Sequence, residues 1–277
     1  MRPIDLRHLG REKVICCWQV GDVLVDPGPE SCAETLVDAL NGEQPKAILL
    51  THIHFDHAGA TGALVRRWPD IPVYVHERGA RHMADPERLV ASATRLYGEE
   101  DFKRLWGEVV PVPEANLRVL QGGETGVEGA FRVAYTPGHA SHHVSYFHEE
   151  SGWAFVGDVG GVRIPPHDLV LAPTPPPDVD VAAWEKSLDL VAGWEPQRLA
   201  ITHFGEVEDP AAQLAACRDA LHEEADLVAG SELEPFIASF RERLEARVPE
   251  EAATYEQAVP YDHIWLGLDR WRSKHAG

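Results

Sequence analysis

The sequence predicts an α/β protein, because strand-like and helix-like segments alternate along its first half. Residues 47–50 are consecutive apolar residues, the pattern of a strand buried on both faces. A helical pattern follows at 58–68, and the apolar segment 71–75 has the character of a second strand. This order of strand, loop, helix and strand is typical of α/β folds, which carry functional side chains at the carboxyl ends of strands.

The segments before residue 47 are expected to form a strand, a hairpin and a helix. β-Branched and aromatic residues at 2–9 and 14–26 predict an opening strand and then the hairpin. Ser31 is a plausible N-cap for a helix that ends at Asn41 and Gly42. These elements complete the first strands-then-helix unit of the chain.

Residues 78–107 interrupt the alternation of strands and helices. Their apolar residues recur at helical spacing and fit one or two helices, and the segment is too long for a simple connection. We expect a helical insertion near the functional site, where it could act as a lid. Its apolar stripe could line a substrate pocket, pack in the core or form a dimer contact, and we favour the core.

The second half, after about Gly122, is expected to repeat the strands-then-helix plan. The predicted strands from residue 117 onward are 117–120, 131–135, 144–148 and 153–156. The proline-rich segment 165–177 predicts an extended loop, followed by a helix at 181–191 and a short strand at 199–202. Past Phe204 the apolar spacing predicts helices up to the aromatic-rich end of the chain.

Composition limits the classes of partner. The chain has 277 residues, 44% of them hydrophobic, and a formal net charge of −20. This charge repels phosphate backbones and anionic lipids, so we expect no nucleic acid or membrane partner. The four cysteines form no CxxC pair, so we expect them to be reduced and buried. Without a leader pattern or an apolar stretch of about 20 residues, a cytoplasmic protein is expected.

A cluster of metal-binding residue types follows the predicted strand at 47–50. His52, His54, Asp56 and His57 fall within six residues. His52 and His54 alternate along an extended backbone and can share one side, while the other two lie at the turn into a helix. Neutral imidazoles suit a zinc-like ion, and a carboxylate beside imidazoles suits a second ion.

Further ligands are available at the ends of later strands. His139, Asp158 and His203 each come directly after a predicted apolar strand. Either histidine alone could equally be an ordinary surface residue at a strand end. The His52–His57 cluster is harder to explain without a metal, because it concentrates polar groups that have no other partner.

Together these motifs resemble the metallo-β-lactamase-fold hydrolases, in the glyoxalase II and lactonase-like branch. The resemblance covers roughly residues 4–205, and all seven metal-ligand positions are filled in order. The segments that carry it are Thr51-His52-Ile53-His54-Phe55-Asp56-His57-Ala58-Gly59, Thr136-Pro137-Gly138-His139, Gly157-Asp158 and Thr202-His203.

The resemblance implies a four-layer αββα sandwich with two divalent metal ions at one edge. His52, His54 and His139 would bind the first ion, Asp56, His57 and His203 the second, and Asp158 would bridge them. It further implies a catalytic domain at 1–205 with the helical insertion at about 78–107, and a C-terminal helical extension at 206–277 packed on the same domain.

Two more residues match supporting positions of this family. Asp26 lies in an Asp-Pro-Gly turn that the resemblance places beneath the metals, where it would orient a ligand by hydrogen bonding. His143 follows His139 by four residues and is expected to support the site or to be a satisfied strand residue.

The implied activity is hydrolysis of an ester, lactone or thioester by a hydroxide that bridges the two ions. Asp56 would be the catalytic residue that passes the proton of the water to the leaving group. We expect zinc, with iron or manganese as alternatives. The open alternatives are a phosphodiesterase on a small substrate and a non-catalytic metal-binding or ligand-binding member of the fold.

Residues that contact the substrate are less well defined by the sequence. Arg163 could bind a substrate carboxylate, and His142 lies beside the ligand His139. His76, Glu77 and His167 are further candidates, although a solvated loop residue is the better explanation for each. The expected partner is a small molecule, and a homodimer is possible.

Overall fold

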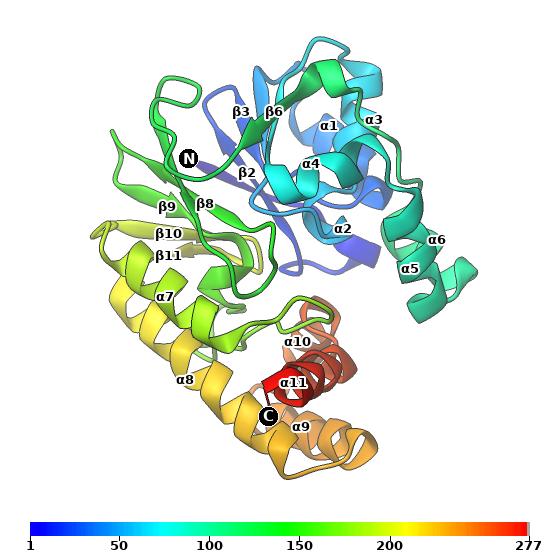
Figure 1. Ribbon diagram of the computed structural model, residues 1–277, viewed down its shortest axis with the longest axis vertical. Coiled ribbons are helices and arrows are strands. Elements are labelled where there is room, and N and C mark those ends of the chain that lie inside the picture. The colour runs from blue at the N-terminus through cyan, green and yellow to red at the C-terminus, as the bar shows by residue number, and fades with distance from the viewer. Residues whose placement is uncertain (276–277) are drawn as a thin grey trace.

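The computed structural model describes residues 1–275 as two β-sheets packed face to face, with helices on both outer faces (Figure 1). The four-layer αββα sandwich expected from the sequence is therefore confirmed. Within the described residues, no helix has the length and apolar character needed to cross a membrane.

The first sheet contains six strands in chain order, so its hydrogen-bonded neighbours are also neighbours in sequence. Its first two pairings are antiparallel and the remaining three are parallel. The strands are β1 (Arg2–Asp5), β2 (Cys16–Val20), β3 (Val23–Val25), β4 (Ala47–Leu49), β5 (Val73–His76) and β6 (Leu117–Leu120).

The second sheet contains five strands in the order β11-β10-β9-β8-β7, and its one parallel pairing joins β9 to β10. Its strands are β7 (Phe131–Tyr135), β8 (Val144–His148), β9 (Trp153–Phe155), β10 (Arg198–Ile201) and β11 (Gly205–Val207). The prediction of helix directly after Phe204 was wrong at this point, because β11 first pairs antiparallel with β10.

Helices cover the outer faces of both sheets and form two projecting groups. The α-helices are α1 (Ala33–Ala39), α2 (Phe55–Ala58), α3 (Thr61–Arg67), α4 (Glu77–Ala84), α5 (Glu87–Tyr97), α6 (Glu99–Trp106), α7 (Val181–Ala192), α8 (Pro210–Ala229), α9 (Leu233–Arg247), α10 (Ala252–Ala258) and α11 (Tyr261–His275). Short 3₁₀ turns lie at η1 (His8–Gly10), η2 (Glu30–Cys32), η3 (Glu114–Asn116) and η4 (Gly157–Gly160).

Three apolar layers hold the sandwich together. The layer between the sheets contains large side chains from both, including Trp18, Phe131, Tyr146 and Phe155, all almost fully buried. A second layer lies between the first sheet and α1, α3 and α4, and a third between the second sheet and α7, α8 and the C-terminal helices. Apolar burial on both faces of each sheet is the main stabilising contribution.

The helical segment after β5 forms three helices, where the sequence predicted one or two. α4 packs on the first sheet through Ala80 and Met83, which belong to the apolar layer there. Within this segment only α5 and α6 project from the sandwich, beside the first sheet, and α9 to α11 project below the second sheet (Figure 1).

All four cysteines are buried and unpaired. Burial raises the pKa of Cys32 to about 11 and raises that of Cys16 further. This agrees with the expectation of reduced, packed thiols.

Gly138 allows the loop after β7 to approach α7 closely. Its φ is +137°, and a Cβ atom there would lie 2.3 Å from the Cα of Trp184. The side chain of Trp184 is fully buried and packs edge-on against the ring of His139, 5.6 Å between centroids. Because glycine has no Cβ atom, α7 can pack directly against the loop that carries His139.

We predict that Gly138→Ala lowers the free energy of unfolding by about 1–3 kcal/mol more than Gly123→Ala, measured by urea denaturation. Gly123 is the matched control because its φ is also positive, +112°, but a Cβ there would meet no atom within 4 Å. Equal losses in the two variants would show that α7 does not rest on this loop.

Candidate metal centre

The carboxyl ends of four strands bring the candidate ligands together. The His52–His57 segment follows β4, and His139 lies in the loop between β7 and β8. Asp158 comes just after β9, and His203 just after β10. Neighbouring strands end at the same edge of the sandwich, so residues more than 150 positions apart meet there.

The first group of ligand atoms belongs to His52, His54 and His139. The Nδ1 atom of His54 lies 3.0 Å from Nε2 of His52 and 2.9 Å from Nε2 of His139. His139 donates its Nδ1 proton to the carbonyl of Pro173, 2.7 Å away, so its Nε2 atom presents a lone pair. This geometry suits a shared cation, which neutral imidazoles bind through such lone pairs.

The second group consists of Asp56, His57 and His203. Oδ2 of Asp56 lies 3.7 Å from Nε2 of His57 and 3.3 Å from Nε2 of His203. His203 donates from Nδ1 to the carbonyl of Val14, 2.6 Å away, which again leaves Nε2 free to bind an ion.

Asp158 lies between the two groups. Its Oδ2 atom is 3.4 Å from Nε2 of His139 and 4.0 Å from Nε2 of His52. Its Oδ1 atom is 3.1 Å from Nε2 of His57 and 3.6 Å from Nε2 of His203. One carboxylate oxygen therefore faces each group, which is the arrangement that a bridging ligand requires.

Asp26 supports the site from below through four hydrogen bonds. Its carboxylate accepts from the backbone N–H of Thr51 at 2.8 Å and from the Thr51 hydroxyl at 2.7 Å. It also accepts from Nδ1 of His57 at 2.8 Å and from the hydroxyl of Thr202 at 3.1 Å. The bond to His57 holds that ring with Nε2 directed at Asp158.

Among the described residues, three candidate ligand atoms are buried without a hydrogen bond of good geometry, although Nε2 of His57 lies 3.1 Å from Oδ1 of Asp158. They are Nε2 of His57, Nε2 of His203 and Oδ1 of Asp158. Buried polar atoms without a partner destabilise a folded protein, and lone pairs that face one another repel. Since these atoms come from residue types that ligate metals, divalent cations fit the site.

The electrostatics of the two groups differ. Burial lowers the pKa of His54 to about 3, with a further contribution from His139, and burial lowers the pKa of His52 well below its usual value. Burial also lowers the pKa of His139. All three rings are thus neutral at pH 7, the form that binds metal.

Carboxylates dominate the second group. Burial would lower the pKa of His57 and of His203, but Asp158 and Asp56 raise both. Burial would raise the pKa of each carboxyl, yet the histidines, His57 foremost, hold both below their ordinary values. This half of the site consequently attracts positive charge.

The other candidate residues near the site lie behind the ligands. His143 is fully buried, with Nδ1 3.0 Å from the Thr136 hydroxyl and with no partner for Nε2 among the described residues. His142 accepts a long hydrogen bond, 3.4 Å, from the backbone of Ile53, and its ring stacks on His52 at 6.1 Å. A cavity of about 380 Å³ opens in front of the candidate ligands, and neither His142 nor His143 lines it.

The remaining substrate candidates point elsewhere. The guanidinium of Arg163 binds the carboxylate of Asp168 and the carbonyl of His167. His167 in turn bonds to Glu251 at 2.6 Å, and His76 stacks on Tyr135. Glu77 accepts a hydrogen bond from the side chain of Gln121. None of these candidates lines the cavity in front of the ligand groups.

Sequence reasoning missed the two threonines that bind Asp26. Thr51 and Thr202 each come directly before a candidate ligand, His52 and His203. This repeated Thr-His pair at two strand ends was a signal that could have identified them. It could not have shown that both hydroxyls reach one carboxylate, because that depends on how the two sheets pack.

Comparison with known proteins places the chain in a family. The family model described as "Metallo-beta-lactamase superfamily" matches residues 21–203. The probable metallo-hydrolase YflN of Bacillus subtilis is 30% identical over 207 residues, which cover 65% of this chain and 74% of YflN. YqgX of the same organism, also a probable metallo-hydrolase, is 34% identical over 50% of this chain and 63% of its own length.

A hydroxyacylglutathione hydrolase of Cronobacter sakazakii is 36% identical over 51% of this chain and 45% of its own length. The match thus spans less than two thirds of YqgX and about half of the Cronobacter enzyme.

Solved structures agree with the sequence comparisons. The metallo-beta-lactamase superfamily protein ST1585 of Sulfolobus tokodaii has the same fold, with a TM-score of 0.67, 21% identity and coverage of 94% of this chain and 93% of that one. TTHA1623, solved in a di-iron-bound form, has a TM-score of 0.52 and 28% identity over 78% of this chain and 96% of its own. The chain belongs to the metallo-beta-lactamase superfamily.

Proposed function

We propose that this protein is a hydrolase that uses two divalent metal ions to cleave an ester, lactone or thioester. The observation that carries the proposal is the position of Asp158, whose two carboxylate oxygens face separate groups of ligand atoms. A single structural ion would need only one of these groups. The hydrolase names of the relatives support the reaction class.

His52, His54 and His139 would hold the first ion, Asp56, His57 and His203 the second, and Asp158 both. Zinc suits imidazole and carboxylate ligands, and iron or manganese suits them also. The di-iron form of TTHA1623 supports a site for two ions in this fold.

Two bound divalent ions supply a water-derived nucleophile at neutral pH and polarise the carbonyl that it attacks. The chain's own contribution is positioning and proton transfer. Asp56 lines the cavity and its side chain is 21% exposed, against 5% for Asp158. Asp56 is therefore the carboxylate placed to accept a proton from water and pass it to the leaving group.

We also propose that residues 1–205 form the catalytic domain, with a helical insertion at about 78–107. Residues 206–277 would form an extension packed on that domain. The packing of α8 against α7 supports an extension that rests on the catalytic domain, and the strand β11 (Gly205–Val207) crosses from one part to the other.

The purified, metal-loaded protein should hydrolyse at least one carbonyl substrate from a panel of p-nitrophenyl esters, lactones and thioesters, and dialysis against a chelator should abolish the activity. Spectrophotometric rates before and after readdition of zinc, iron or manganese would measure this. Hydrolysis of bis-p-nitrophenyl phosphate alone would instead identify a phosphodiesterase, and an inert result on every substrate would contradict the proposal.

Asp158→Asn should reduce the bound metal from about two ions to at most one per chain, because it removes the anionic ligand common to both groups. Elemental analysis after dialysis gives the stoichiometry. Asp70→Asn, the same change at an exposed position, should leave the metal content unchanged. Two tightly held ions in the Asp158 variant would rule out the bridging role.

Asp26→Asn should weaken the binding of the ion at His57 by roughly 10–100-fold, since the amide no longer supplies the charged acceptor that orients the ring. Competition with a chromophoric chelator measures the affinity. Asp22→Asn is a suitable control, because Asp22 is exposed in the turn between β2 and β3. Equal affinities in the two variants would show that Asp26 does not position the ligand.

A further inference from the structure

A cavity of about 380 Å³ opens in front of the ligand groups. Its floor contains Asp56, Asp158 and His203, and its walls come from three segments that lie outside the sheets. These segments are α5 with α6, the proline-rich loop around 173–177, and the end of α10 with the start of α11. The size is within the range of small-molecule sites.

Aromatic side chains from different helices form one wall. Tyr97 at the end of α5 contacts Trp106 of α6 and His263 of α11 edge-on, with ring centroids 5.9 and 5.5 Å apart. Phe55 lies close to Trp106 on the side of the ligand loop, 6.3 Å between centroids. The projecting helices are thereby joined across the cavity.

His8 connects the N-terminal segment to both sides of this wall. It donates from Nε2 to the carbonyl of Leu105 at 2.9 Å, and its ring stacks on Trp106 with an interplanar angle of 8°. The backbone carbonyl of His8 accepts from the side chain of Gln257 at 2.9 Å. His8 therefore links α6 to α10 at one side of the cavity.

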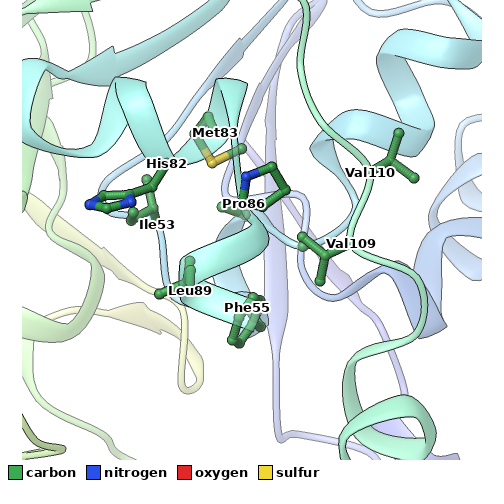
Figure 2. Close-up of a pocket in the computed structure, with 10 residues that line it drawn as sticks. Ile53, Phe55, His82, Met83, Pro86, Leu89, Val109 and Val110 are labelled. Carbon is green, nitrogen blue, oxygen red and sulfur yellow. The ribbon is translucent and has the colours of Figure 1, made fainter. Parts of the chain in front are cut away.

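Apolar contacts anchor the start of α5 to the ligand loop. Figure 2 shows Pro86 and Leu89 beside Phe55 and Met83, around a gap too small for a ligand. Leu89 and Phe55 also line the large cavity, so the same two side chains attach α5 to the fold and form part of the wall.

In the part of the chain that the structure describes, the cavity wall carries no formal charge apart from the candidate ligand groups. Among the described residues that line it, the only carboxylates are Asp56 and Asp158, and no lysine or arginine is present. Burial lowers the pKa of His8 and of His263, which keeps both rings neutral at pH 7. The rest of the lining is largely proline, aliphatic and aromatic.

We propose that this cavity binds the uncharged, apolar acyl chain of an ester or lactone and disfavours acyl chains that end in a carboxylate. This inference rests on the proposed hydrolase function for the reacting carbonyl. A buried carboxylate without a cationic partner is costly, whereas each buried CH₂ adds favourable free energy. The cavity therefore favours uncharged acyl chains over charged ones and longer chains over shorter ones.

The first test compares p-nitrophenyl acetate, butanoate and hexanoate with mono-p-nitrophenyl adipate, on the metal-loaded protein. We expect kcat/KM to rise about fourfold per added CH₂ from acetate to hexanoate. The adipate ester has the same chain length as the hexanoate but ends in a carboxylate, and should be at least tenfold slower.

The second test places a cation in the wall. Ala93→Lys introduces an ammonium group at a position on α5 that lines the cavity. This variant should lower kcat/KM for the hexanoate ester by roughly tenfold or more. Its kcat/KM for the adipate ester should then equal or exceed that for the hexanoate ester. Ala91→Lys, the same change at an exposed residue of α5 that does not line the cavity, should alter neither substrate. Thermal unfolding and metal content of both variants verify that they fold.

A binding measurement separates the two proposals. Calorimetry of the metal-free protein with hexanamide and with adipamate, its carboxylate-bearing analogue, should show binding of hexanamide alone, and Ala93→Lys should remove it. Hexanamide binding without hydrolysis of any ester would support the cavity assignment and contradict the hydrolase function. Ester hydrolysis in which the adipate ester equals or exceeds the hexanoate would overturn the cavity assignment and leave the hydrolase function intact.

Discussion

The buried carboxylate of Asp26 is the interaction on which the site depends. It follows β3 of the first sheet, and it accepts hydrogen bonds from Thr51 after β4 and from Thr202 after β10 of the second sheet. It also orients His57. A charge with less than 1% exposure is tolerated because four donors surround it. One residue thus joins the two sheets at the edge where the ligands converge.

The ligand groups and the cavity are built on different principles. The candidate ligands lie on strand ends and short loops of the sandwich, with ring nitrogens held by carbonyls such as those of Val14 and Pro173. Rigid elements of this kind can fix ligand atoms with the accuracy that metal binding requires. The cavity wall instead consists of projecting helices that meet through aromatic contacts, including Tyr97 with His263. We therefore assign the proposed reaction and the proposed choice of substrate to separate parts of the chain.

The sequence was a good guide to the sheets and a weaker guide to the helices around the cavity. Short apolar segments bounded by turns predicted the strands, and β11 was missed because it is a three-residue edge strand beside a helix signal. The segment 78–107 read as one insertion, yet its first helix, α4, packs on the sheet like an ordinary crossover helix. Arg163 was placed near the ligands by its sequence position, but its guanidinium binds Asp168.

The sequence by itself determined the α/β class and the candidate ligands, because strand pattern and the spacing of His52, His54, Asp56 and His57 are local properties of the chain. Only the tertiary structure decided which oxygen of Asp158 faces His139 and which faces His57. It also decided that His8 joins Trp106 and Gln257 at one wall of the cavity. These contacts join residues up to 249 positions apart. They depend on how sheets and helices pack, which local sequence patterns do not encode.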